Sequence, residues 1–332
     1  MMAHTAQTTH THKFINQIAA GETINEVYVV RDPILRSTSR GDLYIAMFLC
    51  DRTGQLNGRM WQASEVVYKS LPKPGFVHVQ GRSELYQNNL QIVINTIAAI
   101  DPSKVNVENY LARTAKDCDQ MFKDVQETVG AIKHPQIAAL VQAFLADEDL
   151  MKAFCAAPGG MKMHHDCIGG LLEHTHSMLC VARSILPLYP KLQTDLVLAG
   201  VFLHDMGKTE ELAYDMAFSY TDSGQLIGHI SKSLLMIHRK VDALRAAGMT
   251  IDPEIVDALG HIILSHHGEY EFGSPKLPAT AEAFMVCYID DLDAKMDQVT
   301  SAIEGELTES NWTAWQNALQ TRLYRKRLTG QG

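Results

Sequence analysis

Histidine and aspartate recur at the ends of apolar segments in the second half of this 332-residue chain. The stretch VFLHDMGK carries His204 and Asp205 directly after three apolar residues, and Gly207 and Lys208 follow. Buried imidazole and carboxylate groups cost free energy unless something pairs them. Similar placements occur at His174, His229, His266, His267, Asp290 and Asp291.

A lone histidine on an apolar helix face is more often a hydrogen-bonded core residue than a ligand. Five apolar helices that each direct His or Asp toward a common interior are different, because metal ions satisfy the whole set together. Imidazole nitrogen with carboxylate oxygen suits Mn, Fe, Co, Ni or Zn. The Asp205 carboxylate can serve two ions at once, and two ions about 3.5–4 Å apart suit in-line phosphoryl displacement.

The elements that must position these residues change character along the chain. We predict a disordered polar leader over residues 1–13 and five short strands over residues 14–103, with one helix between the third and fourth strands. That strand pattern is typical of an OB-fold barrel, with a generic small barrel or sandwich as the alternative. Helical spacing predicts a helical linker over 104–160, an all-α bundle over 161–303 and a C-terminal helix over 304–332.

One face of the predicted barrel could bind an unpaired nucleotide strand. Arg59 and Trp61 alternate away from the apolar face of their strand, and Tyr44 and Phe48 share a face of the adjacent strand. A guanidinium beside an indole is a good platform for a base and its phosphate. The alternative is that Phe48 and Trp61 fill the barrel.

Composition narrows the class of protein. The net charge of −9 argues against nucleic-acid binding through bulk charge, although residues 13–104 hold 10 Lys and Arg against 8 Asp and Glu. Six scattered cysteines without CxxC spacing favour a reducing cytoplasm. No apolar run approaches the length of a membrane span, and no phosphate-binding loop motif follows a strand. Self-association into a homo-oligomer stays open.

The ordered set from His174 to Asp290 resembles the ligands of the HD-domain metal-dependent phosphohydrolases, and HDMGK resembles their HDxGK motif over about residues 161–303. HHDCIGGLLEHTHSM, GQLIGHI, SHHGEYEFGSPKLPATAEA and YIDDLDAKM, behind DRTGQLNGRMW, resemble the YhaM-type 3′→5′ exoribonucleases over nearly the whole chain. This resemblance implies an OB-fold followed by an HD domain. It also implies divalent-metal catalysis, with Mn most typical and Fe, Co, Ni or Mg as alternatives. The implied reaction releases nucleoside monophosphates from single-stranded RNA, with some activity on single-stranded DNA.

The resemblance also implies how two ions share the ligands. The first ion would take His174, His204, Asp205 and Asp290. The second ion would share Asp205 and take His229 and His266, with His267 as a competing choice. Asp290 is preferred to Asp291 as a metal ligand. Asp291 and Asp293 could instead be solvated carboxylates, or carboxylates that contact the side chain of a metal ligand.

Four further residues complete the predicted reaction site. Asp205 and Lys208 are the predicted catalytic residues, and Lys208 would steady a phosphate oxygen as a point charge unless it is a surface lysine. Gly207 is expected to let the chain turn. His164 and His165 are candidates for contact with phosphate or ribose, or else two exposed loop histidines.

Two other functions fit parts of the sequence. An HD phosphohydrolase could act on mononucleotides or cyclic dinucleotides, but such substrates need no strand-binding barrel. A nucleic-acid-binding regulator could carry an inactive metal site, but an inactive site would be expected to lose some ligands, and none is missing here.

Overall fold

The computed structural model describes residues 12–38, 40–86, 89–160, 167–214, 219–304 and 310–326. The described residues of 12–112, together with Tyr214, form one compact unit, and the described residues of 113–213 and 219–326 form another. Apart from its last two residues, the predicted leader lies outside these ranges, and so do His164 and His165.

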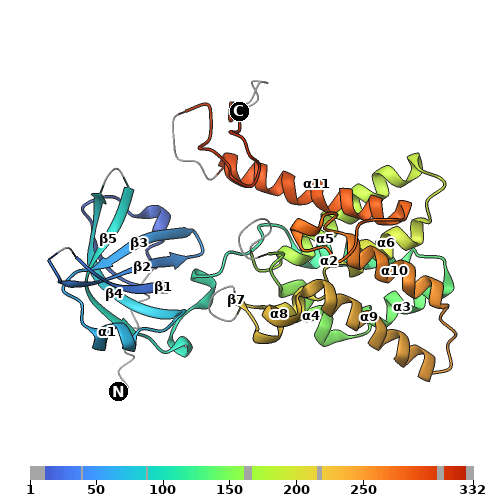
Figure 1. Ribbon diagram of the computed structural model, residues 1–332, viewed down its shortest axis with the longest axis horizontal. Coiled ribbons are helices and arrows are strands. Elements are labelled where there is room, and N and C mark those ends of the chain that lie inside the picture. Colours follow the sequence, from blue (N-terminus) through green and yellow to red (C-terminus); the bar gives the residue numbers. More distant parts are fainter. Residues whose placement is uncertain are drawn as a thin grey trace, which may run out of the picture. The chain divides into compact units, whose positions relative to one another are not determined.

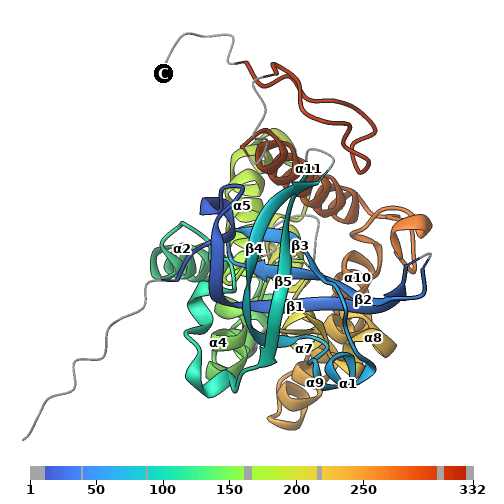
Figure 2. The ribbon, with the colours of Figure 1, turned by 90° about the vertical axis from the view of Figure 1, so that its left-hand side faces the viewer.

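The first unit is a closed barrel of five strands (Figure 1, Figure 2). The strands are β1 (Thr23–Ser37), β2 (Leu43–Asp51), β3 (Gly54–Met60), β4 (Gly75–Tyr86) and β5 (Asn89–Ala99). They pair in the order β1-β2-β3-β5-β4, with β3 and β5 parallel and helix α1 (Glu65–Ser70) between β3 and β4. The predicted OB-fold barrel is therefore confirmed.

The barrel interior follows the alternation in the sequence. Ile45, Met47 and Leu49 of β2 are buried in the core, whereas Tyr44 and Phe48 are half-buried on the other face. In β3, a Cβ atom at Gly58 would lie 3.1 Å from the Met47 side chain, so glycine lets this strand close over the core.

A segment ahead of β1 seals the barrel. Ile15 and Ile18 belong to its core, and the backbone amide of Ile15 donates to Asp51 at 2.6 Å. The His12 ring is buried, 3.4 Å from a Glu26 oxygen and 3.5 Å from an Asp51 oxygen. This segment therefore has specific polar contacts as well as apolar ones.

The second unit is almost entirely helical (Figure 1). Its helices are α2 (Cys118–Gly130), α3 (Pro135–Leu145), α4 (Glu148–Ala156), α5 (Gly170–Ile185), α6 (Thr194–Leu203), α7 (Lys208–Glu211), α8 (Asp222–Ile227), α9 (His229–Ala246), α10 (Pro253–Ser265) and α11 (Ala281–Glu304). A two-stranded ribbon pairs β6 (Leu212–Ala213) with β7 (Ser219–Tyr220). Every residue of α6 from Leu196 to Leu203 is buried, so α6 is the central helix, with α5, α10 and α11 packed against it. None of the described helices is long and apolar enough to cross a bilayer.

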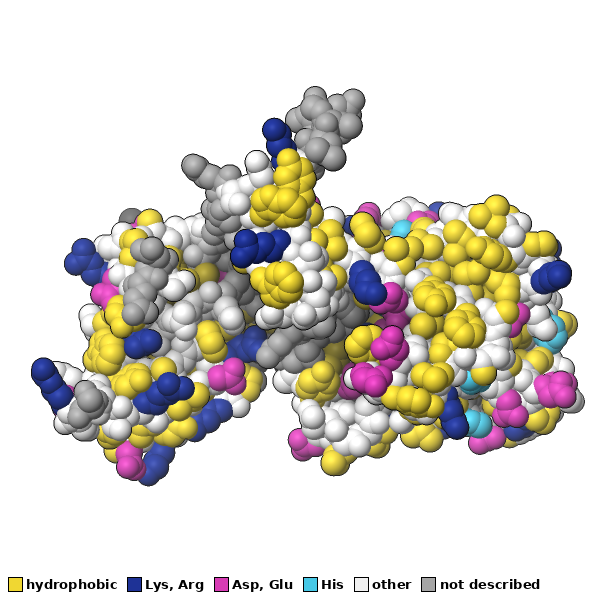
Figure 3. All heavy atoms as spheres, turned by 45° about the horizontal axis from the view of Figure 1, so that its top comes forward, with side chains coloured by type: hydrophobic (Ala, Val, Ile, Leu, Met, Phe, Trp, Pro, Cys, Tyr) yellow, Lys and Arg dark blue, Asp and Glu magenta, His cyan; other side chains and the backbone are white. Residues whose placement is uncertain are grey.

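One face of α11 is apolar and exposed. Phe284, Tyr288, Leu292 and Met296 follow one another at four-residue spacing, and all are exposed. Figure 3 views the protein from the side of α11 and shows hydrophobic side chains gathered on the helical unit.

The predicted C-terminal helix over 304–332 is wrong for its described part. Helix α11 ends at Glu304, and residues 310–326 form bends joined by two bridges, Trp312 to Tyr324 and Gln316 to Thr321. The Trp312 and Tyr324 rings meet edge to face at 5.1 Å. The Asn, Thr and Trp residues of this segment are weak helix formers, so the cross-segment contacts prevail over its helical spacing.

Candidate metal centre

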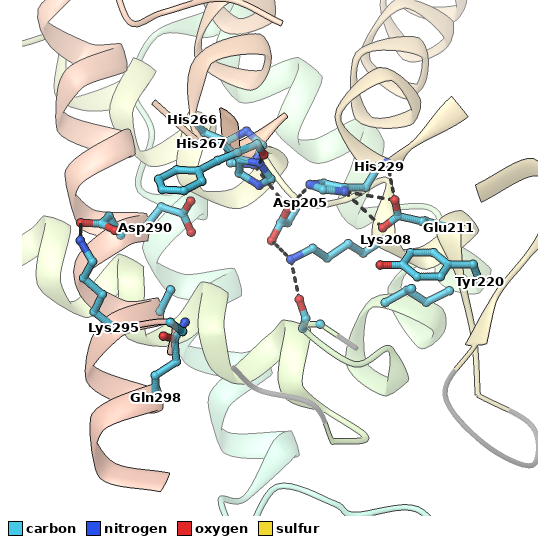
Figure 4. Close-up of a pocket in the computed structure, with 17 residues that line it drawn as sticks. Asp205, Lys208, Glu211, Tyr220, His229, His266, His267, Asp290, Lys295 and Gln298 are labelled. Atoms are coloured by element: carbon cyan, nitrogen blue, oxygen red, sulfur yellow. Dashed lines mark hydrogen bonds and ion pairs between the residues drawn. The ribbon is translucent and has the colours of Figure 1, made fainter. Parts of the chain in front are cut away.

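Five helices of the second unit bring the predicted ligands together (Figure 4). The ligands come from α5, the α6–α7 turn, the start of α9, the end of α10 and the middle of α11, in the order His174, His204, Asp205, His229, His266, His267 and Asp290. Because α6 is buried on all sides, the turn that follows it lies deep in the unit. Gly228, with φ of 77°, separates α8 from α9 and makes His229 the first residue of α9.

The carboxylate of Asp205 lies at the centre of this group. Its Oδ2 is 2.6 Å from Nζ of Lys208 and 3.2 Å from Nε2 of His204. Its Oδ1 faces the other way, 3.4 Å from Nε2 of His229 and 3.6 Å from Nε2 of His266. The two oxygens of one side chain therefore address two different sets of imidazoles.

The side chains form two neighbouring clusters. Ligand atoms of His174, His204 and Asp290 lie within 4.8 Å of one another, and so do those of His229, His266 and His267. A third group of His204, Asp205 and His266 links them with the same spacing. The described residues could thus hold two ions that share Asp205, and both His266 and His267 lie in reach of the second position.

Carboxylates outside the clusters orient two of the histidines. Nδ1 of His174 lies 2.7 Å from Asp293, and Nδ1 of His229 lies 3.2 Å from Glu211. Each contact directs the opposite ring nitrogen, Nε2, toward the interior. A carboxylate behind a histidine also raises the basicity of the nitrogen that faces a metal.

Backbone carbonyls orient the remaining three histidines. Nδ1–H of His204 donates to the Val201 carbonyl at 2.8 Å, and Nδ1–H of His266 donates to the Ile263 carbonyl at 2.7 Å. His267 does the same with the Phe272 carbonyl at 2.8 Å. In a neutral imidazole held in this way, Nε2 is the nitrogen without a proton, and it is this nitrogen that can bind a metal.

Several of the inward atoms are buried without a hydrogen bond. Within the described ranges this holds for Nε2 of His204, His229 and His266 and for Oδ1 of Asp205. An unsatisfied buried polar atom costs about 1–3 kcal/mol, so natural proteins keep few of them. Divalent ions would satisfy all four atoms at once, and the nitrogen-rich donor set fits such ions.

The protonation states also suit metal binding. Burial opposes ionisation of Asp205, but the charges of Lys208 and His204 hold its pKa well below the usual range. Burial lowers the pKa of His266, and burial together with His266 lowers the pKa of His267 to about 4. For His174, burial is outweighed by hydrogen bonds to acidic residues of α11, which raise its pKa to about 9 in the metal-free chain. A bound cation would favour the neutral imidazole there.

The burial of Lys208 and the backbone conformation of Gly207 decide two points that the sequence interpretation raised. Lys208 is buried, so the alternative of a surface lysine is wrong, and its ammonium donates to the Gly159 carbonyl as well as to Asp205. Gly207 has an ordinary helical φ of −63°, so no special turn requires glycine. A Cβ atom there would instead strike the carbonyl oxygen of His229. Glycine therefore lets α9 approach the α6–α7 turn.

A pocket of about 480 Å³ opens onto the clusters (Figure 4). Lining residues that the sequence interpretation did not single out include Glu211, Tyr220, Phe272, Lys295 and Gln298. Asp291 also lines it and pairs with Lys295 at 2.7 Å, whereas Asp290 lies 3.1 Å from His174. The geometry thus separates the two adjacent aspartates.

The barrel carries a second group of candidate residues, described here by itself. The Arg59 guanidinium lies 5.8 Å from the Trp61 ring centre and 5.5 Å from that of Tyr86, and Tyr44 and Trp61 lie 5.0 Å apart. Trp61 is 43% exposed, so the alternative that it fills the barrel is wrong. Phe48 packs against a small cluster that includes Phe76 and is not part of the platform. Tyr86 was missed because it comes from a distant strand.

Comparison with known proteins agrees with this geometry. The family model for the HD domain matches residues 171–295, so the helical unit belongs to the HD class. The chain is 32% identical over 294 residues to the 3′-5′ exoribonuclease YhaM of Bacillus subtilis (strain 168), covering 87% of this chain and 91% of that protein. It is 33% identical over 302 residues to 3′-5′ exoribonuclease YhaM of Geobacillus sp. (strain WCH70), covering 90% and 91%. The chain belongs to the YhaM family.

A comparison with solved structures gives a weak match. The second OB-fold domain of replication protein A from Methanococcus maripaludis aligns with a TM-score of 0.24 and 20% identity, covering 27% of this chain and 96% of that domain.

Proposed function

We propose that this chain is a metal-dependent 3′→5′ exoribonuclease that shortens single-stranded RNA to nucleoside monophosphates. Membership of the YhaM family supports this activity. The observation that carries the proposal is the Asp205 carboxylate, whose two oxygens face two separate histidine groups. One buried carboxylate that can serve two ions suits the two-ion sites that catalyse phosphodiester displacement.

The ligands divide between the two positions as follows. We assign His174, His204 and Asp290 to one ion, His229 and His266 to the other, and Asp205 to both, with His267 as an additional ligand. When bound, divalent ions lower the pKa of water and stabilise charge on a phosphate during displacement. Membership of the YhaM family supports Mn, with Fe, Co, Ni or Mg as alternatives, and the mixed nitrogen and oxygen donors suit first-row divalent ions in general.

The residues around the clusters have their own tasks. Lys208 presents a buried ammonium in the pocket and would hold a non-bridging phosphate oxygen, at the expense of its contact with Asp205. Asp293 and Glu211 keep the rings of His174 and His229 aimed at the interior.

The barrel would bind the strand upstream of the cleaved end. Arg59, Trp61 and Tyr44 present a cation beside exposed aromatic faces, which suits unpaired bases of any sequence. This platform favours a strand over a mononucleotide or a cyclic dinucleotide, and stacking alone also admits single-stranded DNA.

We further propose that the exposed apolar face of α11 supports self-association, which light scattering of the purified chain would measure.

A cleavage assay tests the activity. The full chain is incubated with Mn²⁺ and a 5′-labelled single-stranded RNA, in parallel with an RNA duplex and a cyclic dinucleotide. We expect a ladder that shortens from the 3′ end on the single strand. Inert RNA together with rapid cleavage of the cyclic dinucleotide would instead identify a small-molecule phosphodiesterase, and the absence of any hydrolysis would favour a regulator.

A further inference from the structure

Two aromatic rings line the pocket beside the metal clusters without being part of them. Tyr220 of β7 is 48% exposed, and Phe272, in the turn after α10, is 65% exposed. Burying large apolar side chains is favourable, so two exposed rings that line the same pocket could gain free energy by contact with a ligand.

The backbone of Tyr220 is fixed to the catalytic turn. Tyr220 pairs with Leu212 across the β6–β7 ribbon, and Leu212 directly follows the helix that carries Lys208 and Glu211. The next residue, Thr221, donates its amide to the Glu211 carbonyl at 2.9 Å. These contacts fix the backbone of Tyr220 relative to the helix that carries Lys208, and the Tyr220 side chain lies beside Lys208 (Figure 4).

The backbone of Phe272 is fixed to the second cluster. Its carbonyl accepts the Nδ1–H of His267 at 2.8 Å, which also orients that imidazole. The backbones of both residues are therefore held beside segments that carry the proposed site, Tyr220 beside the end of α7 and Phe272 beside His267. A flexible surface aromatic would have no such connection.

We propose that Tyr220 and Phe272 bind the base of the 3′-terminal nucleotide by stacking, an inference that rests on the proposed exonuclease function. The pocket has the volume of a small-ligand site, and its wall includes these two rings together with Lys208 and Lys295 as cations. Stacking tolerates every base, because every base has a π face. The site thus selects a phosphodiester whose terminal unit carries a base, whichever base that is.

The test compares two RNAs that differ only in the terminal base. One short 5′-labelled RNA ends in a normal nucleotide, and the other ends in an abasic nucleotide. The full chain with Mn²⁺ removes the terminal unit from each, and kcat and KM are measured separately. The variants are Tyr220→Leu and Phe272→Leu, which keep apolar bulk without an aromatic ring, with Tyr220→Phe and Phe272→Tyr as matched controls that keep it.

We expect the wild-type chain to prefer the normal RNA by at least about fivefold in kcat/KM, mainly through KM. Each Leu variant should lose most of this preference, and both ring-keeping variants should retain it. Cleavage of the RNA with the abasic terminus, which offers no terminal base to stack, should remain within about twofold in all four variants, because the metal clusters are intact.

Two results would overturn the inference alone. One is that Tyr220→Leu and Phe272→Leu both keep the wild-type ratio of kcat/KM between the normal and the abasic RNA. The other is loss of cleavage of the abasic RNA in the Leu variants, since the rings would then support the metal centre itself. A wild-type chain that hydrolyses bis(p-nitrophenyl) phosphate and shortens neither RNA would instead refute the exonuclease function.

Discussion

Replacing Asp205 by asparagine tests the idea that one carboxylate serves two ions. Asparagine has nearly the same shape but no charge, so Asp205→Asn leaves packing intact. In the wild-type chain this carboxylate is only 2% exposed, and four cationic or imidazole groups lie within 3.6 Å of its oxygens. The change therefore removes an anionic ligand from both clusters together.

The expected magnitude follows from linkage. An ion present at about 1,000 times its Kd stabilises the folded state by about 4.1 kcal/mol. For a helical unit of this size, about 1 kcal/mol shifts Tm by roughly 2–4 °C, so saturating Mn²⁺ should raise the Tm of the wild-type chain by roughly 8–16 °C. Without metal, the variant should also lose about 3 kcal/mol, because the buried ammonium of Lys208 loses its anionic partner.

The assay is thermal unfolding with and without Mn²⁺, together with RNA shortening and RNA retention. We expect Asp205→Asn to show almost no Mn²⁺-dependent shift and no shortening, yet to retain RNA through the barrel. Asp291→Asn is the matched control, because Asp291 pairs with Lys295 and should not hold an ion. A Mn²⁺ shift of wild-type size in Asp205→Asn would refute the shared-ligand argument, and loss of RNA retention would mean that the ions hold the strand.

Three further outcomes are expected. Glu211→Gln should lower activity about 10- to 100-fold at limiting Mn²⁺ and recover with excess metal, because His229 loses the carboxylate that orients it; metal titration of activity measures this. Trp61→Ala should weaken single-stranded RNA binding by about fivefold or more without changing hydrolysis of a small diester, measured by fluorescence anisotropy. Burial opposes the charge of His12, but Asp51 and its other acidic neighbour raise its pKa to about 9. The stability that His12 contributes is therefore fully present below about pH 6.5 and is lost as pH rises through 9, so urea midpoints should fall over that window in the wild-type chain and not in His12→Gln.

The ligands were predictable because they lie in or just after apolar segments that have to be buried. A polar group at the end of such a run, as at His204 after Leu203, needs a partner wherever the helix packs. The barrel was predictable for a similar reason, since strict alternation as in β2 leaves one face for the core.

Residues whose role depends on a distant partner were not predictable. Glu211 looks like one of two acidic residues in a short helix, and only the fold sets it behind His229. Tyr86 joins Arg59 only when two strands far apart in the sequence enclose the same barrel. The sequence shows a glycine at position 207 but does not show why glycine is needed. In the structure the cause is close packing of α9 and not the backbone conformation of a turn.

That spacing at Gly207 has a consequence for how such sites diversify. The start of α9, with His229, packs closely against the α6–α7 turn because Gly207 has no Cβ atom. The amide of Gly207 also donates to the hydroxyl of Ser233 in α9 at 2.7 Å. An alanine there would push α9 outward and carry His229 away from Asp205, while the cluster of His174, His204 and Asp290 would keep its geometry. The number of ions could therefore change between homologues that share every ligand, through a residue that touches no metal.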